Sequence, residues 1–333
     1  MRSFQYILFT FLFIGLYVPV LAQYDSLYIN TYKDKFYIKP IFSVRSAEVE
    51  LKGKFDGFEN VRYIPNGNSY YGLGIYILGI NFELSTKFPS SWQRPTEIYG
   101  YTNSFDLQAN IYTRKIGVDL SFQLYDGFYL DKPKRHIATW QVGDVYPQRD
   151  DLTYENLHLN VFYVFNHKRF SFRSSYNQSE EQLKSAGSPI LSFTFADVKI
   201  SANETLFPNE TLVPEVVKGF NYADYITYAV LGGYGYNFLY KDFYANLTLS
   251  LGLGIQNREI RPNFVEKNRI LTGVSNLRVA IGYNTDFFFA GISTVNQFTS
   301  TNLGDVDLNV GTSNFKLFLG LRFKEKMIFK RNK

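Results

Sequence analysis

The chain has 333 residues, of which 18% are aromatic, and its mean hydropathy is −0.17. This hydropathy excludes a bundle of transmembrane helices, whereas 27 Tyr and 32 Phe suit a protein with aromatic rings at two membrane interfaces. The absence of cysteine excludes a cysteine-linked lipid anchor, a disulfide-stapled fold and thiolate chemistry. The net charge of +5 comes largely from residues 324–333, so nucleic-acid binding has no support.

The N-terminal residues have the pattern of an export signal. An apolar run from Tyr6 to Leu21 follows Arg2 and ends in Val20-Leu21-Ala22. This pattern predicts a signal peptide at 1–22, cleaved after Ala22. The alternative is an uncleaved anchor helix, although the run is short for a span of about 20 residues. We expect a polar periplasmic lead at 23–35 to follow the cleavage site.

Alternation of apolar and polar residues predicts strands along the rest of the chain. Pro40 weakens the first strand, and Asn66-Gly67 predicts a tight turn after the second. The clearest hairpin runs from Phe105 to Leu124, where the polar face includes Asp106 and Asp119. The expected strands are 36–51, 61–64, 70–84, 105–111, 116–124, 157–165, 170–176, 228–238, 243–255, 277–283, 287–295 and 315–323.

The connections between these strands alternate between two lengths. Short turns are expected near residues 65, 113, 167, 241 and 285, and the connections between them are long and polar. Outer-membrane barrels have short periplasmic turns and long extracellular loops. A soluble sandwich also alternates apolar and polar faces, but it does not need about 10 residues in strand after strand. The sequence therefore predicts an all-β fold, an antiparallel transmembrane β-barrel at 36–323.

The strand count follows from parity. Both ends of such a barrel lie in the periplasm, so the number of strands is even. About 12 strands are expected. The segment Ile190–Ser201 also has a strand pattern, but a thirteenth crossing would reverse every later strand. We therefore assign it to an extracellular loop, with 14 strands as the alternative if a further strand lies in 202–220.

The last expected strand carries a second signal. Phe315–Phe323 alternates apolar residues and ends on an aromatic, which is similar to the C-terminal pattern that the barrel-assembly machinery reads. An ordinary closing strand would have the same pattern. Barrels of this kind often stop at the aromatic, whereas here a basic tail, expected to be periplasmic, follows at 324–333.

Three short segments resemble an uncharacterised family of Bacteroidota outer-membrane β-barrels, known as a domain of unknown function. They are Tyr63-Ile64-Pro65-Asn66, Asp126-Gly127-Phe128-Tyr129 and Lys184-Ser185-Ala186-Gly187-Ser188. The resemblance covers roughly 30–323. It implies a secreted barrel and no assigned activity, so it assigns no functional residues.

The histidines give no support to an enzyme. Outer-membrane hydrolases use a Ser–His pair, in which His acts as the base. None of His136, His158 and His167 has Ser two residues away on the same strand, and they are too scattered for a metal site. We therefore expect no enzymatic activity and no cofactor.

A set of charged residues lies in phase with the expected lumen. It consists of Asp106, Asp119, Arg173, Arg278, Lys316 and Arg322. Because unpaired charge beside lipid is costly, these side chains should face inward. They could form a paired, salt-bridged plug or line a narrow hydrated pore with a basic excess, and the sequence leaves both open.

The functional hypotheses follow from these two alternatives. The first is a channel or transporter for small solutes. The alternative is a non-conducting barrel with a structural or surface-binding role through long loops at 125–154 and 179–225. A hydrolase is the least favoured. The expected partners are outer-membrane lipid, lipopolysaccharide and the barrel-assembly machinery, and the expected state is a monomer.

Overall fold

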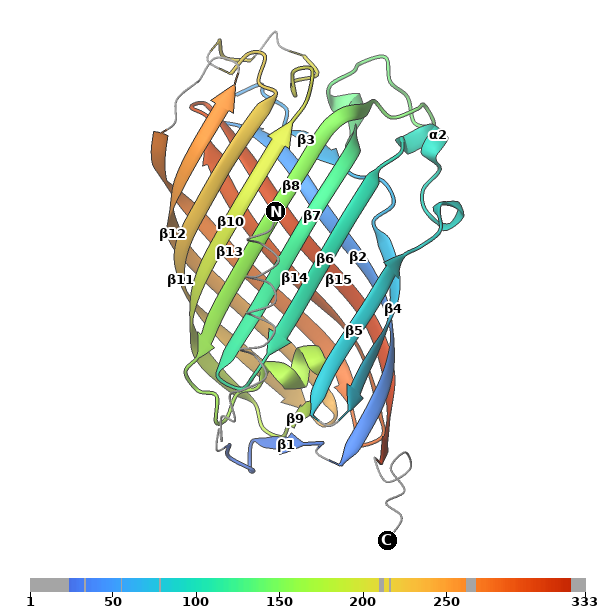
Figure 1. Ribbon diagram of the computed structural model, residues 1–333, viewed down its shortest axis with the longest axis vertical. Coiled ribbons are helices and arrows are strands. Elements are labelled where there is room, and N and C mark those ends of the chain that lie inside the picture. The colour runs from blue at the N-terminus through green and yellow to red at the C-terminus, as the bar shows by residue number, and fades with distance from the viewer. Residues whose placement is uncertain are drawn as a thin grey trace, which may run out of the picture.

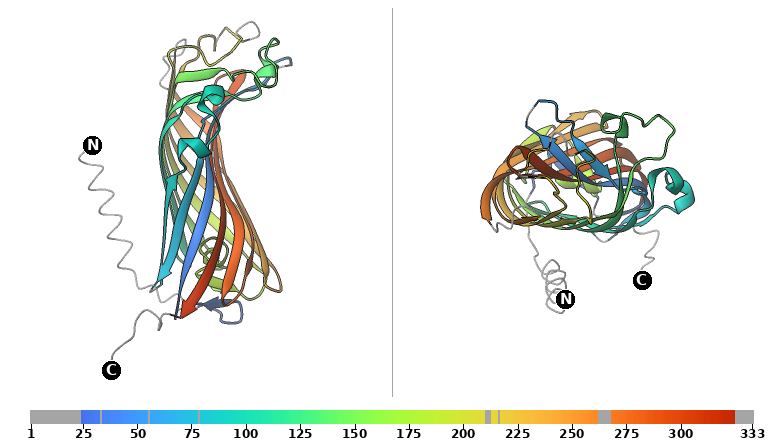
Figure 2. Two further views of the ribbon diagram at one scale, coloured as in Figure 1. Left: turned by 90° about the vertical axis from the view of Figure 1, so that its right-hand side faces the viewer. Right: turned by 90° about the horizontal axis from the view of Figure 1, so that it is seen from above.

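The computed structural model describes residues 24–324, except 33, 55, 78, 210–212, 216 and 262–267. The predicted signal peptide at 1–22 and the predicted tail at 324–333, apart from Lys324, lie outside these residues. The described chain is an antiparallel β-barrel whose strands are strongly tilted (Figure 1). Its cross-section is flattened, and connections gather above one end (Figure 2).

The elements are almost all strands. These strands are β1 (Ile29–Thr31), β2 (Lys35–Gly53), β3 (Val61–Ile64), β4 (Ser69–Ile77), β5 (Ile80–Lys87), β6 (Asn103–Tyr112), β7 (Ile116–Leu130), β8 (Gln148–Val164), β9 (Glu180–Gln182), β10 (Ala186–Ser201), β11 (Tyr222–Tyr240), β12 (Phe243–Arg261), β13 (Asn268–Asn284), β14 (Phe288–Asn302) and β15 (Val306–Lys324). The short helical turns are η1 (Ser90–Trp92), α2 (Thr96–Tyr99), η2 (Pro133–Arg135) and the π-helical η3 (Arg173–Asn177). None of the described helices is long and apolar enough to cross a membrane.

Thirteen strands form one sheet, and ten of them close a ring. The ring runs from β2 through β15, β14, β13, β12, β11, β10, β8 and β7 to β3, which pairs with β2 again. The other three strands extend the wall, because β4 pairs with β2, β5 with β4, and β6 with β7. In the part of the chain that the structure describes, no ladder joins β5 to β6.

Three strand predictions need correction. The segment Ile190–Ser201 is not an extracellular loop, because it belongs to β10, which pairs with β8 and β11 along its length. Phe170–Tyr176 is not a strand but contains η3. The expected strand 70–84 is a hairpin of β4 and β5, with Gly79 at φ +85 in the turn, a backbone conformation that suits glycine.

The predicted parity is nevertheless correct. The strand wrongly assigned at 170–176 and the strand missed at 190–201 cancel each other in the count. In addition, β3 and β4 pair with the upper and lower parts of β2, so they are successive parts of one crossing. Both ends of the described barrel therefore lie at the same end, with the short turns (Figure 1).

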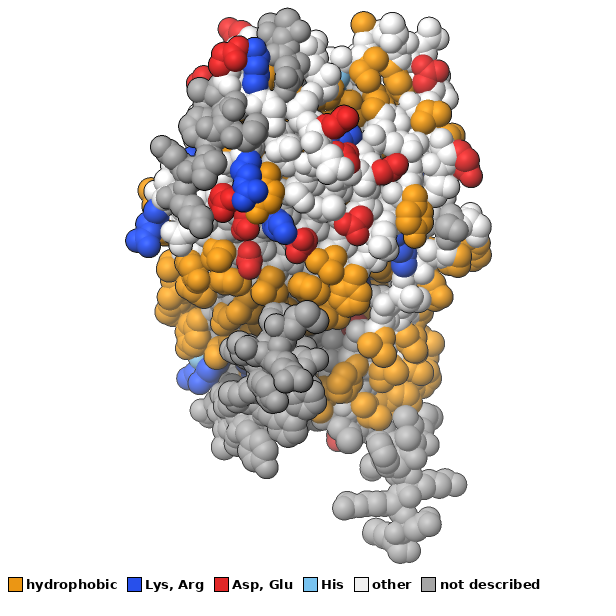
Figure 3. Space-filling model, turned by 45° about the horizontal axis from the view of Figure 1, so that its top comes forward, with side chains coloured by type: hydrophobic (Ala, Val, Ile, Leu, Met, Phe, Trp, Pro, Cys, Tyr) orange, Lys and Arg blue, Asp and Glu red, His pale blue; other side chains and the backbone are white. Residues whose placement is uncertain are grey.

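The lipid-facing surface forms a belt around the barrel, in the half that lies nearer the short turns. On β12 the outward residues from Phe243 to Ile255 are apolar and exposed. This stretch spans roughly 28 Å for a tilt of about 45°, which matches the apolar band of a transmembrane barrel. Figure 3 shows the apolar belt below a charged surface. Stacked aromatic pairs lie near its two borders, Phe88 on Trp92 and Phe36 on Phe323.

Above this belt the apolar and polar faces of the strands exchange sides. On β2 the outward residues are apolar from Phe36 to Val44 and then become Ser46, Glu48, Glu50 and Lys52. The inward residues change in the opposite sense, from Lys39, Ser43 and Arg45 to Ala47, Val49 and Leu51. Only about 9–11 residues are needed to cross a membrane, and β2 has 19. The upper part of the barrel is therefore built like a soluble protein.

An apolar core fills this extracellular half. It includes Val49 and Leu51 of β2, Tyr154 of β8, Ile200 of β10 and Leu308 of β15. Side chains of the connection between β10 and β11, such as Phe207 and Phe220, pack into the same core. The predicted extracellular loop at 179–225 is thus only partly correct, because 202–221 alone connects β10 to β11 above the belt.

A plug closes the other end of the lumen. We call residues 165–185, between β8 and β10, the plug. Its Phe170, Phe172 and Tyr176 pack against Tyr112 and Phe162 of the wall. At its end β9 pairs with β1, so part of the predicted N-terminal lead lies across the mouth of the barrel (Figure 1).

Candidate functional site

The six charged residues predicted for the lumen all lie inside the barrel or at the plug. They do not form one site but four separate polar groups. These groups occupy the level of the belt, between the apolar core and the mouth.

The first group joins opposite walls of the barrel. Asp119 of β7 and Arg278 of β13 form an ion pair across the lumen, and they are 2% and 0% exposed. The Asp119 carboxylate also accepts hydrogen bonds from Tyr112 Oη (2.7 Å), Asn110 Nδ2 (2.8 Å) and Asn160 Nδ2 (3.2 Å). The guanidinium lies over the ring of Phe162, 4.7 Å from its centroid. This group is a buried brace between opposite walls, in which Arg278 Nε alone has no hydrogen-bond partner among the described residues.

The second group is built around one carboxylate. Glu83 of β5 binds Lys316 Nζ of β15 at 2.7 Å and Lys39 Nζ of β2 at 2.6 Å. Lys39 is 1% exposed and also donates to Gln178 Oε1 of the plug at 3.1 Å. The sequence prediction included Lys316 but missed Lys39 and Glu83. Lys39 could have been found, because it alternates with the apolar residues from Phe36 to Val44.

The third group contains Asp106 of β6 and Arg45 of β2. Arg45 Nη1 donates to the Asp106 carbonyl oxygen at 2.8 Å and lies 3.5 Å from its carboxylate, and Arg45 Nη2 donates to Ser85 Oγ. The Asp106 carboxylate also accepts from Tyr125 Oη (2.6 Å) and Gln123 Nε2 (2.8 Å). Arg45 was not predicted, although it has the same phase as Lys39.

The fourth group fixes the plug. Arg173 of η3 and Arg114 share the Glu180 carboxylate, at 3.2 and 3.0 Å. Arg322 donates to the carbonyl oxygens of Gln178 (2.7 Å) and Thr285 (2.5 Å). Arg173 was predicted to face the lumen from a strand. It lies in the lumen, but on the plug and not on a strand. No pattern in the sequence signals Glu180, because β9 has only three residues and shows no alternation.

Each of the six predicted residues therefore has a bonding partner in the described structure. The apolar core lies on the extracellular side of these groups, and the plug with β1 and β9 lies on the other side. This arrangement corresponds to the paired, salt-bridged interior of the two sequence interpretations.

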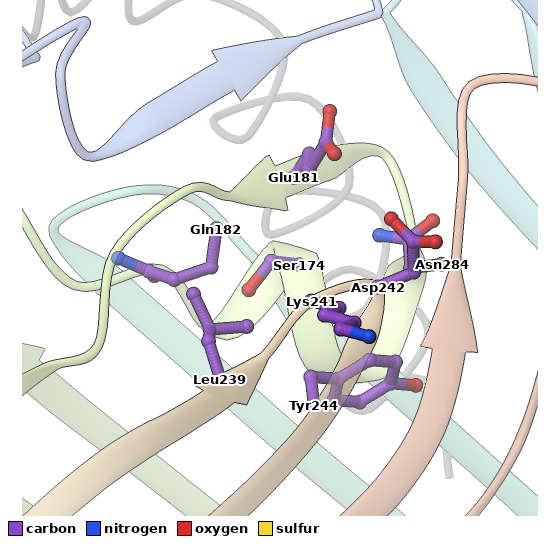
Figure 4. Close-up of a pocket in the computed structure, with 8 residues that line it drawn as sticks. All are labelled: Ser174, Glu181, Gln182, Leu239, Lys241, Asp242, Tyr244 and Asn284. Carbon is purple, nitrogen blue, oxygen red and sulfur yellow. The ribbon is translucent and has the colours of Figure 1, made fainter.

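A shallow recess opens at the plug end of the barrel (Figure 4). It has about 270 Å³ of empty space, including open solvent, and is lined by Ser174, Glu181, Gln182, Leu239, Lys241, Asp242, Tyr244 and Asn284. Tyr244 Oη donates to the Ser175 carbonyl oxygen of the plug at 3.3 Å. The recess thus lies where the plug meets the ends of β11, β12 and β13.

The three histidines lie apart. His158 of β8 is buried and faces Ser121 of β7 as its register partner, a juxtaposition that a search along single strands misses. Its Nδ1 has no hydrogen-bond partner among the described residues. His136 lies in the β7–β8 connection and His167 in the plug. Within the described ranges, no group of three or more metal-binding side chains is placed to hold a metal ion.

Comparison with known proteins identifies the family. The model of a family described as a domain of unknown function (DUF4421) matches residues 23–323. A comparison with curated proteins finds no match. Among solved structures, the outer-membrane protease OmpT from Escherichia coli is 11% identical, with a TM-score of 0.35 over 88% of this chain and 98% of that one.

Two further solved structures are similar at the same low level. Ail, the attachment invasion locus protein of Yersinia pestis, has 11% identity and a TM-score of 0.23, over 87% of this chain and 99% of that one. OmpT of Vibrio cholerae, an outer-membrane protein, has 9% identity and a TM-score of 0.26, over 86% and 98%. These values support no transfer of activity.

Proposed function

We propose a role for this chain, which belongs to the family described as a domain of unknown function (DUF4421), from its own structure. It is a barrel of the bacterial outer membrane that does not form an open channel and that binds partners through its extracellular end. Its export by a cleaved signal peptide and its origin in Bacteroidota are part of the proposal. The exposed apolar belt and the aromatic side chains near its borders support the membrane location.

The filled lumen supports a non-conducting barrel. An ion on its way through would have to displace the buried Asp119–Arg278 brace, the plug and the apolar core. Rearrangements of the connections alone would not open such a path, because most of the core side chains come from the strands of the wall.

Contacts between β8 and the β10–β11 connection support a binding role for the extracellular end. Arg149 and Asp151 of β8 form an ion pair at 2.7 Å that holds the β10–β11 connection. Arg149 Nη1 donates to the Thr205 carbonyl oxygen at 2.7 Å, and the Asn203 amide donates to Asp151 at 2.9 Å. These bonds tie the start of the β10–β11 connection to β8, and ordering before binding lowers the entropic cost of binding a partner.

Several partners remain part of the proposal. Lipopolysaccharide and outer-membrane lipid would surround the belt. The barrel-assembly machinery would recognise Phe315–Phe323, whose outward residues are apolar in β15. We further propose a monomer and no enzymatic activity. A hydrolase would need Ser121 and His158 to be hydrogen-bonded and accessible, and both are buried.

Planar-bilayer recording tests the central part of this proposal. The protein, refolded and shown to be native by heat-modifiable gel migration, should give no steady conductance. A gated channel for small solutes is the second candidate, favoured by the way the plug forms a separate segment that the ion pair between Arg114 and Glu180 holds to the barrel. Steady currents with anion preference, weakened by Arg278→Ala with Arg322→Ala, would support that candidate and contradict the first.

A further inference from the structure

The wall of the barrel is open along one line. We call the facing edges of β5 and β6 the seam. Because β5 pairs only with β4 and β6 only with β7, these edges form no ladder with each other in the described structure. Backbone groups left unpaired in hydrocarbon are costly, so transmembrane barrels normally close every edge. An open seam therefore needs an explanation.

The upper end of the seam is bridged by side chains. Lys87, the last residue of β5, donates through Nζ to Ser104 Oγ (3.0 Å) and to the Thr102 carbonyl oxygen (3.3 Å). Below it, Arg45 reaches the Asp106 carbonyl oxygen from inside. The stacked Phe88 and Trp92 lie on the connection just above. These contacts join β5 and β6 at the extracellular end of the seam.

Polar groups of the lumen are accessible through the seam. On β7 the inward residues from Gly117 to Gln123 are buried. On β6 the corresponding Gln108 and Asn110 are partly exposed, and on β5 Ser85 is exposed. The inward residues of the two edge strands are thus less covered than those of β7, while the apolar core and the plug cover the two ends of the lumen.

The space behind the seam has an excess of positive charge. Three bases, Lys39, Arg45 and Lys316, face two acids, Glu83 and Asp106. Glu83 is shared by both lysines, and Asp106 already accepts bonds from Tyr125 and Gln123. An unbalanced charge in a low-dielectric interior favours the binding of a counter-charge.

Two buried polar atoms in the same region have unused bonding capacity. Arg45 and Asn314 are register partners on β2 and β15, and they are 7% and 6% exposed. Arg45 Nε and Asn314 Oδ1 have no hydrogen-bond partner among the described residues. Other buried atoms of the described chain, such as Arg278 Nε and Arg322 Nε, are also without a partner, so these two atoms add bonding capacity at this place and do not by themselves define a ligand.

The outer lips of the seam are apolar. Phe82 and Leu84 of β5 are 55% and 80% exposed, and Phe105 and Leu107 of β6 are also exposed on the outer face. A ligand in the seam would therefore meet apolar side chains on its outer part and basic side chains on its inner part.

We propose that the seam binds a single-chain amphiphile with an anionic head group, taken up laterally from the bilayer. Its head group lies near Lys316 and Arg45, and its tail lies between Phe82 and Phe105. This inference rests on the membrane placement proposed above. It adds a ligand class that the occluded lumen alone does not suggest.

The test measures binding of a dansyl-labelled undecanoate to the full barrel in phosphatidylcholine nanodiscs, with empty nanodiscs as the blank. We expect saturable fluorescence enhancement that laurate reverses and the neutral dodecanol does not. Lys316→Gln should weaken binding roughly tenfold, because it removes one charged hydrogen bond. Lys199→Gln, on the outer surface above the belt, is the matched control and should have no effect.

Cross-linking the seam tests the route. Since the chain has no cysteine, Leu84→Cys with Phe105→Cys can be joined by a reversible bifunctional methanethiosulfonate. Joining them should abolish binding, and reduction should restore it. The same treatment of Leu249→Cys with Leu277→Cys, register partners on β12 and β13, should change nothing. Heat-modifiable migration shows that each variant is folded.

Three outcomes would overturn the proposal. The first is binding that survives the seam cross-link or is equal for laurate and dodecanol. The second is spontaneous, complete disulfide formation between the seam cysteines, which would show that β5 and β6 pair directly. The third is protection of these cysteines by a second protein in native membranes. Because the binding assay uses purified barrels, failure of the outer-membrane location would appear separately, by fractionation.

Discussion

The Asp119–Arg278 brace should behave as a buried ion pair whose partners depend on each other. In Arg278→Met the methionine fills part of the space of the guanidinium, but Asp119 keeps its charge inside the barrel. Removing one partner of a buried pair typically costs about 3–5 kcal/mol. We expect the lower end of this range, about 3 kcal/mol, because three hydrogen bonds to the carboxylate remain.

A double-mutant cycle isolates the interaction. Asp119→Asn with Arg278→Met removes both charges, and we expect it to recover about 2 kcal/mol relative to Arg278→Met alone. The assay is urea unfolding in phosphatidylcholine vesicles, followed by the fluorescence of Trp92 and Trp140. Lys199→Met, which breaks the exposed pair with Glu155, should cost no more than about 1 kcal/mol. A cost below about 1 kcal/mol for Arg278→Met, or no recovery in the double variant, would refute the reasoning.

Three further predictions concern the belt, the close approach of strands and the Arg149–Asp151 ion pair that holds the β10–β11 connection, which we call the clamp. Leu249→Arg, at the centre of the apolar stretch of β12, should cost roughly 2–4 kcal/mol of unfolding free energy, and Asn257→Arg, on the same face above the belt, much less; equal costs would show that the belt is misplaced. The Arg149 hydrogen bond lowers the pKa of Asp151 from 3.8 to about 2, so its stabilisation, about 1 kcal/mol after solvent screening, is present above pH 4 and lost as the pH falls towards 2. The wild-type protein should lose this unfolding free energy between pH 5 and pH 2, and Asp151→Asn should not. If the difference in unfolding free energy between wild type and variant is the same at pH 5 and pH 2, that result would argue against the clamp. Gly117→Val should impair assembly because a Cβ there would lie 2.1 Å from the Phe162 ring, and a normal yield of heat-modifiable barrel would contradict that packing.

The strands of the belt could be predicted from the sequence, because the alternation of lipid-facing apolar residues with polar residues is uninterrupted there. The pattern in β7 and β12 predicts both strands and their faces, and the phase rule places Asp119 and Arg278 inside. The same rule assigns Lys316 and Arg322 to the inward face of the last strand, and both lie on β15. These residues could be found because one face of each strand meets hydrocarbon and tolerates no polar side chain.

The plug and the hairpin of β4 and β5 could not be predicted from local pattern. Phe170 and Phe172 alternate with Ser171 and Arg173 as they would in a strand, yet here both rings pack into the lumen and the chain turns into η3. What decides between the two is the space inside a barrel that the rest of the chain has already formed. Gly79 interrupts a stretch that otherwise reads as one strand.

The reversal of faces along β2 has a consequence for how the barrel sits in the bilayer. Sliding deeper would bring Glu48 and Glu50 into hydrocarbon, and sliding outward would expose Phe42 to water. Either displacement is opposed on every strand that reverses in this way, so the vertical position of the molecule is set by its sequence. The extracellular half has its own apolar core, so its unfolding should have a positive heat-capacity change. The lipid-facing belt should not contribute such a change. The contribution of the extracellular half to stability should therefore weaken on cooling, whereas the belt should remain in the membrane.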